Sequence, residues 1–305
     1  MAYSGFVWTG LDHVIVAVRD LAAAERSYAR LLGRSASWRG EHPALGTENA
    51  LFRLAGTYVE LLAPAAAGTG WLRERLDAQG EGLLGFALAT DAADACAKAL
   101  AERGLHPQPP VRGVGRDRES GAFREWWNVL LPASETRGVL IFGIAHLSAP
   151  ELLPEVPPAG AREAAVHGID HVVVRTADPD AARAFYGEGL GLRLALDREF
   201  PRWGARLLFF RVGGLTVELA ARHGAAPEPG TPDRAWGISY RVANADAARA
   251  RLAAAGFEVS DVHVGRRPGT RVFTVHGDPC GVATLMLEPP AHEGANASAA
   301  KPRAQ

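Results

Sequence analysis

The chain has 305 residues, 48% of them hydrophobic, which is enough to bury the cores of two domains. Its 33 Lys and Arg residues nearly balance its 34 Asp and Glu residues, which argues against a basic surface for nucleic acid or an anionic membrane. It has no apolar run of the roughly 20 residues that a membrane helix needs, and residues 1–10 lack a secretory signal. We therefore expect a cytoplasmic protein, with a small molecule as its partner.

The first predicted strand reads Leu-Asp-His-Val at residues 11–14, and residues 169–172 read Ile-Asp-His-Val. The two histidines are 158 positions apart, from position 13 to position 171. The same offset relates further landmarks: Tyr28 to Tyr186, Gly33 to Gly191, and Glu60 to Glu218. An offset that is kept over a strand, a helix and the return strands predicts a tandem duplication.

Each copy also repeats its own order of elements. A strand is predicted over residues 84–90 and a helix over 92–103, and in the second copy this pair falls on 237–242 and 245–255. With the opening strand, the first helix and the return strands, this order predicts an α+β fold of four βαβββ half-modules. Four polar residues are candidate N-caps of the helices: Asp20, Asp91, Asp180 and Asn244.

Composition sets the predicted boundaries. Residues 149–165 are rich in Pro and Ala, which disfavours helix and predicts a semi-rigid linker. We therefore expect a first module at 10–148 and a second module at 166–290. The polar residues 291–305 predict a disordered tail.

Three motifs of the first module point to a known family. They are Leu-Asp-His-Val at 11–14, a helix ending in Leu-Leu-Gly at 31–33, and Tyr-Val-Glu-Leu-Leu-Ala-Pro at 58–64. Together with the repeated half-modules, they resemble the vicinal oxygen chelate superfamily, which includes glyoxalase I, extradiol dioxygenases and bleomycin-binding proteins. The resemblance implies two tandem modules with cupped mixed sheets. It covers nearly the whole chain outside the linker and the tail.

The resemblance also implies a metal site. A strand histidine and a carboxylate from a later strand suit a divalent metal such as Fe, Mn, Ni, Zn or Co, which can polarise a carbonyl. The family's ligand positions in the first half-modules fall on His13 with Glu60 and on His171 with Glu218. The family's ligand positions in the second half-modules fall on residues without a metal-binding side chain: Gly85, Phe142, Gly237 and Leu285.

Three alternatives follow for the missing ligands. A β-bulge could turn Glu288 inward, which would give the second module the set His171, Glu218 and Glu288. Half-modules of different copies could pair instead, and only a pairing of the first half with the third would gather both His/Glu pairs into one site. In the third alternative there is no metal, and His and Glu serve as acid–base groups or contact a ligand. A glutamate in an apolar strand is costly to bury unpaired, so it needs a cation, a proton or solvent.

Aromatic and arginine side chains form the expected cavity wall, with packing in the core as an equal alternative. The substrate-contacting candidates are Trp126, Trp127, Trp203 and Arg202.

The leading functional hypothesis is a metal-dependent enzyme acting on a small oxygenated organic substrate by glyoxalase-like lyase or isomerase chemistry. Glu60 or Glu218 would be the ligand or the base that moves a proton. The alternatives are a binding or resistance protein without metal or catalysis, and an extradiol ring-cleaving dioxygenase. If one copy is only a scaffold, we expect the second to be active, because a carboxylate lies near its last strand. A second copy of the chain, forming a homodimer, is the one protein partner that we consider.

Overall fold

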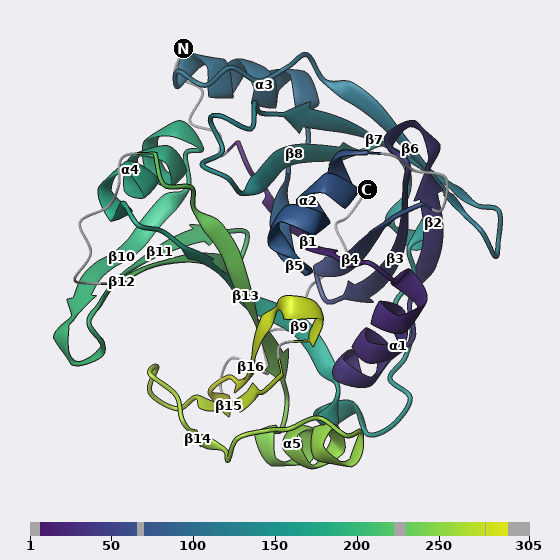
Figure 1. Cartoon of the computed structure of the whole chain (residues 1–305), viewed down its shortest axis with the longest axis vertical. Coiled ribbons are helices and arrows are strands. Elements are labelled where there is room, and N and C mark those ends of the chain that lie inside the picture. Colours follow the sequence, from purple (N-terminus) through teal and green to yellow (C-terminus); the bar gives the residue numbers. More distant parts are fainter. Residues whose placement is uncertain (1–6, 66–69, 223–229, 278, 292–305) are drawn as a thin grey trace.

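The computed structural model describes residues 7–65, 70–222, 230–277 and 279–291. In these ranges each copy forms an eight-stranded mixed sheet, and the two copies lie side by side (Figure 1). None of the helices in these ranges is long and apolar enough to cross a membrane. The predicted disordered tail lies outside the described residues from position 292 onward.

The first module is a closed barrel with the strand order β1-β4-β3-β2-β6-β7-β8-β5. Its strands are β1 (Gly10–Ala17), β2 (Trp38–His42), β3 (Thr47–Leu54), β4 (Thr57–Pro64), β5 (Gly82–Ala89), β6 (Val111–Asp117), β7 (Phe123–Leu130) and β8 (Leu140–His146). Its helices are α1 (Leu21–Leu32), α2 (Trp71–Gln79) and α3 (Ala93–Glu102), with a 3-10 turn at Pro43–Leu45. The short pairing of β2 with β6 closes the barrel.

The second module is an open sheet with the order β10-β11-β12-β9-β13-β16-β15-β14. Its strands are β9 (Val166–Arg175), β10 (Arg193–Phe200), β11 (Ala205–Val212), β12 (Leu215–Arg222), β13 (Arg234–Val242), β14 (His263–Val264), β15 (Arg271–Val275) and β16 (Ala283–Glu288). Its helices are α4 (Pro179–Arg183), continued by a π-helical turn (Ala184–Gly189), and α5 (Ala245–Ala254). Its 3-10 turns are Pro201–Trp203 and Pro279–Gly281, and the linker forms Pro150–Leu152 and Arg162–Ala164. The predicted α+β fold of four βαβββ half-modules is confirmed, with α2 as an unpredicted addition.

Strand pairing corrects one alternative. Every described strand, in the first module and in the second, pairs within its own module. The exchange of half-modules between copies, which would have gathered both His/Glu pairs into one site, is therefore wrong.

The candidate helix caps divide evenly. The side chains of Asp20 and Asn244 each accept a hydrogen bond from a first-turn amide of α1 and α5, as predicted. Asp178, rather than Asp180, caps α4. The prediction that Asp91 caps the following helix is also wrong, because α3 begins at Ala93 and has no hydrogen bond from a capping side chain.

One hydrophobic core joins the two modules. It contains the outward-facing Val14 of β1 together with Tyr240 of β13 and residues of helix α1. The modules are also joined by polar contacts: the indole nitrogen of Trp8 donates to the carbonyl of Leu190 at 2.6 Å. Because this core is shared, the two copies pack as one body.

Both ends of the barrel of the first module are filled. Helix α2 lies beside β1, β4 and β5 (Figure 1). Its Leu72 and Leu76 pack against Ala17 and Leu62, at the carboxyl ends of the parallel strands β1 and β4. At the opposite end, Leu153 of the linker is buried. Its neighbours are Trp38, Leu51 and Tyr58 of β2, β3 and β4.

The linker therefore contributes to the core of the first module, and this contribution can be measured. Leu153→Ala should lower the free energy of unfolding by about 3 kcal/mol, because it leaves a cavity among large side chains. Urea denaturation followed by circular dichroism would measure the loss. Leu152→Ala, at an exposed neighbouring position, is the control and should change stability by less than about 0.5 kcal/mol. Equal losses in both variants would contradict a packed linker.

Candidate functional site

Each module holds its histidine with the aspartate that precedes it. In β1, Nδ1 of His13 lies 2.7 Å from a carboxylate oxygen of Asp12. In β9, Nδ1 of His171 lies 2.8 Å from Asp170. An aspartate on Nδ1 fixes the orientation of the ring and leaves Nε2 for a ligand, a proton or a metal.

The predicted glutamates lie on the other side of each ring. Because β4 runs parallel to β1 with Tyr58 opposite His13, Glu60 lies two residues further along the same face. Nε2 of His13 is 3.4 Å from Oε2 of Glu60, and the corresponding distance from His171 to Glu218 is 3.5 Å. The structure therefore brings together both predicted pairs, in the same geometry.

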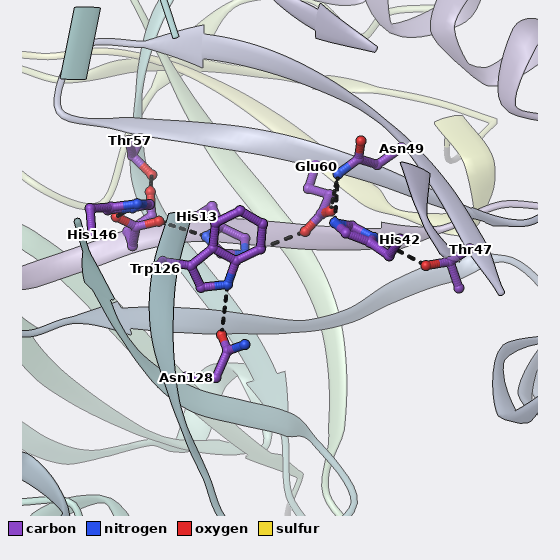
Figure 2. A network of polar contacts seen from close by, with 10 residues as sticks. His13, His42, Thr47, Asn49, Thr57, Glu60, Trp126, Asn128 and His146 are labelled. Atoms are coloured by element: carbon purple, nitrogen blue, oxygen red, sulfur yellow. Dashed lines mark hydrogen bonds and ion pairs between the residues drawn. The ribbon is translucent and has the colours of Figure 1, made fainter. Parts of the chain in front are cut away.

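The pair in the first module belongs to a larger polar network, which Figure 2 shows from close by. Asn49 donates from Nδ2 to Glu60 at 2.7 Å and lies beside His42. His146 contacts the second oxygen of Asp12 at 2.9 Å. The ring of His13 stacks on Tyr58 at 4.5 Å. His13 is therefore held on all sides inside the barrel, and its side chain is 4% exposed.

This network is strongly ionic. Burial alone would lower the pKa of His13, but hydrogen bonds with Asp12 and Glu60 outweigh it and raise the pKa to about 9. Burial would raise the pKa of both carboxyls, yet the contacts with His13 bring the pKa of Asp12 and of Glu60 below their usual values. These directions of the pKa shifts favour a protonated His13 between ionised Asp12 and Glu60 in the first module.

The pair in the second module has looser surroundings. Arg241 donates from Nε to Asp170 at 2.9 Å, and the hydrogen bond of His171 with Asp170 helps to lower the pKa of that carboxyl despite its burial. Glu218 has a distant neighbour, Nη1 of Arg266 at 3.9 Å. The side chain of His171 is 15% exposed, while Glu218 is about as exposed as Glu60, at 10% against 11%. The two modules therefore differ in hydrogen bonding and in access from the open sheet.

The positions of the missing ligands have a steric explanation. A Cβ added to Gly85 would collide with the backbone carbonyl of Leu140 on β8, and one added to Gly237 would lie 2.8 Å from the carbonyl oxygen of Ala283. The close approach of parallel strands thus excludes a side chain at both glycines. In the first module the other ligand position is filled by Phe142, whose ring contacts His13.

Glu288 does not supply the third ligand. Its Oε2 accepts a hydrogen bond from the amide of Ala245 at 2.7 Å, at the N-terminus of α5, and lies 3.4 Å from Arg271. This side chain lies on the opposite face of β16 from Leu285, because strand residues alternate. The predicted set of His171, Glu218 and Glu288 is therefore wrong. Across the described ranges, no group of three His, Cys, Asp or Glu residues could hold a metal ion.

The aromatic candidates fall in three places. Trp126 lies inside the barrel, edge-on to His42 at 6.2 Å, with its indole donating to Asn128 (Figure 2). Trp127 points outward and packs on the shared core, so its expected place in a cavity wall is wrong. Trp203 is 51% exposed on the second module, and the neighbouring Arg202 is exposed as well.

Sequence reasoning missed Arg266. Its guanidinium lies over the ring of Trp203 at 4.1 Å and 3.9 Å from a carboxylate oxygen of Glu218. Arg266 therefore contacts both the exposed tryptophan and the buried glutamate. It comes from the loop between β14 and β15, far away in the sequence. The role of the aspartates was also missed, although their place before both histidines was a signal that could have found them.

Comparisons with known proteins agree with this architecture. The model of the glyoxalase-like domain matches residues 11–166, and that of the glyoxalase/bleomycin resistance protein/dioxygenase superfamily matches 168–285. No curated protein matches the chain by sequence.

Several solved structures are similar in fold. A mutant of 4-hydroxymandelate synthase from Streptomyces coelicolor matches over 92% of both chains, with 12% identity and a TM-score of 0.65. The Mn(II)-bound glyoxalase from Novosphingobium aromaticivorans matches over 92% of this chain and 82% of its own, with 15% identity and a TM-score of 0.60. A halotolerant catechol dioxygenase matches over 93% and 87%, with 13% identity and a TM-score of 0.57. At these identities the likeness shows the fold alone.

Proposed function

The chain belongs to the glyoxalase-like domain family of the vicinal oxygen chelate superfamily, and on that premise we propose that its second module transforms a small oxygenated organic molecule. The reaction is of the glyoxalase-like lyase or isomerase class, in which a proton moves at a carbon next to a carbonyl. One observation supports this most directly: Asp170, His171 and Glu218 form an acid–base chain on the face of an open sheet.

Each residue of the chain has a distinct role in this reaction. Glu218 is the base that takes the proton, because its carboxylate lies 3.5 Å from Nε2 of His171 and 3.9 Å from Arg266, distances longer than those of close ion pairs. His171 presents Nε2 to the oxygen on which charge develops, and Asp170 holds the ring for that task. Arg266 is placed to bind a carboxylate of the substrate beside the ring of Trp203.

A resident divalent metal fits these residues incompletely. His171 and Glu218 would supply two protein ligands, whereas mononuclear catalytic sites commonly use three. The described residues add no third His, Cys, Asp or Glu to the group. A ring-cleaving dioxygenase with a two-histidine, one-carboxylate triad is disfavoured for the same reason, because each pair contains one histidine. We therefore assign proton transfer to the side chains themselves.

A second candidate function is supported by the exposed apolar side chains of the second module. Trp203 is 51% and Leu196 is 42% exposed, and Phe200 stacks on Trp203 at 4.8 Å. Such a surface suits a planar aromatic ligand, which fits a binding protein without catalysis. Binding that quenches tryptophan fluorescence, with no turnover of any compound tested, would favour this alternative.

The catalytic proposal is tested by hydrogen exchange in deuterated water. Protein dialysed against a chelator is incubated with small α-hydroxyketones, α-hydroxyacids and α-oxoacids, and proton NMR follows the signal of the carbon-bound hydrogen next to the carbonyl. We expect at least one class to lose that signal far faster than without protein. Exchange that disappears after chelation and returns with Mn²⁺ or another divalent metal would contradict a reaction carried by side chains. No exchange with any class would contradict the proposed chemistry.

A further inference from the structure

A β-bulge in β9 brings Asp170 to the side of the strand on which His171 lies. The pairing of β9 with β13 skips Asp170, because its neighbours Ile169 and His171 face consecutive residues of β13. Adjacent residues of a regular strand point to opposite faces, and a bulge re-aims the extra residue. Asp12 is skipped in the same way in the pairing of β1 with β5. Both aspartates therefore reach Nδ1 of the histidine that follows them.

The carboxylate of Asp170 is held from two sides. Oδ2 lies 2.8 Å from Nδ1 of His171, and Oδ1 accepts a hydrogen bond from Nε of Arg241 at 2.9 Å. Burial would raise the pKa of Asp170, but the hydrogen bond with His171 and the charge of Arg241 outweigh burial and lower it. An ionised carboxylate only accepts hydrogen bonds, so Nδ1 of His171 carries a proton and donates it. Arg241 thus fixes the plane of the carboxylate to which the imidazole is bonded.

The two modules supply this second partner from different strands. Arg241 lies on β13, two residues after the position that faces His171, and the residue at the same register on β5 is Ala89. Alanine has no side-chain donor, and in the first module Nε2 of His146 contacts the second oxygen of Asp12 at 2.9 Å. His146 is the last residue of β8. Each copy therefore places a nitrogen donor on the second oxygen of its aspartate, although a different strand carries the donor.

We propose that Arg241 is a positioning residue: through Asp170, it keeps the ring of His171 in the orientation that presents Nε2 to the substrate. This role rests on the reaction proposed for the second module. The guanidinium keeps its charge at every physiological pH, and its Nη2 also reaches the carbonyl of Gly214 at 3.5 Å, in the turn between β11 and β12. Anchored in this way, Arg241 restricts rotation of the carboxylate and, with it, rotation of the imidazole.

The first measurement uses the isotope-labelled, full-length protein without substrate. Proton NMR detects Nδ1–H protons of hydrogen-bonded histidines, and His171→Ala identifies the signal of His171. Arg241→Gln should speed the exchange of that proton with water about tenfold or more, the effect of losing a charged hydrogen bond. The signal of His13 should stay unchanged. His146→Ala is the matched control in the first module and should leave the signal of His171 unchanged.

Two outcomes of this measurement would overturn the proposal. One is a His171 proton that exchanges equally fast in Arg241→Gln and in the wild type. The other is a wild-type signal already lost to exchange, because a fixed ring protects its hydrogen-bonded proton. The side chain of Arg241 is 32% exposed, so we expect Arg241→Gln to fold. Arg241→Lys keeps the charge but places its donor differently, so it should give intermediate exchange and serves if the first variant does not fold.

The second measurement uses the deuterium exchange reaction with the substrate class that reacts. Arg241→Gln should lower kcat about tenfold and keep KM within about twofold, because Arg241 acts on His171 and not on the substrate. When Asp170 is already replaced in Asp170→Asn, adding Arg241→Gln should cause no further loss, since both act through one contact.

The kinetic outcomes that contradict the proposal are equally distinct. A higher KM with an unchanged kcat would assign Arg241 to substrate binding, and additive losses with Asp170→Asn would show that Arg241 acts independently of Asp170. Either result would overturn the proposal. If the wild type exchanges no substrate at all, the proposed function fails, and the NMR measurement alone decides whether Arg241 positions His171.

Discussion

Glu218→Gln is expected to lower the rate of deuterium exchange by about 100-fold or more, the usual contribution of a general base. The amide has nearly the same shape as the carboxylate but takes up no proton at neutral pH. Because the ion pairs of Glu218 are long, 3.5 Å to Nε2 of His171 and 3.9 Å to Arg266, the variant should remain folded with a nearly unchanged Tm. The measurement is the exchange rate by NMR at equal concentrations of folded protein.

The first module supplies the matched control for that variant. Glu60→Gln makes the same change at the equivalent position of the duplication, beside His13. We expect its exchange rate per folded molecule to stay within about twofold of the wild type, since side chains close both ends of the barrel. The reverse outcome, with Glu60→Gln inactive and Glu218→Gln active, would transfer the reaction to the barrel. Similar losses of exchange rate in Glu60→Gln and Glu218→Gln would contradict the proposal that only the second module is active.

His13→Ala is expected to lower the free energy of unfolding by about 3 kcal/mol or more. The histidine lies between Asp12 and Glu60, and removing it leaves two buried carboxylates facing an empty space. It also removes the ring that stacks on Tyr58. Urea denaturation monitored by fluorescence would measure the loss, and Asn49 and His146 would retain part of the network.

His171→Ala is the matched variant in the second module. Its loss of stability should be about 1 kcal/mol, because Asp170 keeps the hydrogen bond from Arg241 and Glu218 lies near Arg266. Its exchange activity should fall sharply. If both histidine variants lose the same stability, the proposed division into a structural pair and a reactive pair is wrong.

Local patterns in the sequence were sufficient to predict the repeated unit. The shared offset of Asp-His and Val-Glu-Leu motifs predicted two modules, and the structure places each histidine 3.4 to 3.5 Å from its glutamate. This works because a parallel pair of strands fixes which residues share a face, so spacing alone brings His13 and Glu60 together. The glycines at 85 and 237 were also identified correctly as positions without a ligand.

The spacing of residues in the sequence did not predict the directions of side chains or the contacts between distant segments. The predicted inward turn of Glu288 failed because its carboxylate satisfies the N-terminus of α5, a partner that the local pattern did not reveal. Trp126 and Trp127 are neighbours in sequence, yet alternation sends one into the barrel and the other onto the shared core. Arg266 reaches Glu218 from a distant loop and carries no motif.

The sequence by itself therefore determined the duplication, the half-module order and the two His/Glu pairs, because these depend on periodicity and strand register. Only the tertiary structure decided how the copies differ. The pairing of β2 with β6 closes one sheet into a barrel that α2 and Leu153 fill, while the other sheet stays open. A cavity between the modules, lined by residues such as Ala17 of β1, Arg75 of α2 and Ala235 of β13, is likewise a product of packing, since these residues meet only when both modules share one core.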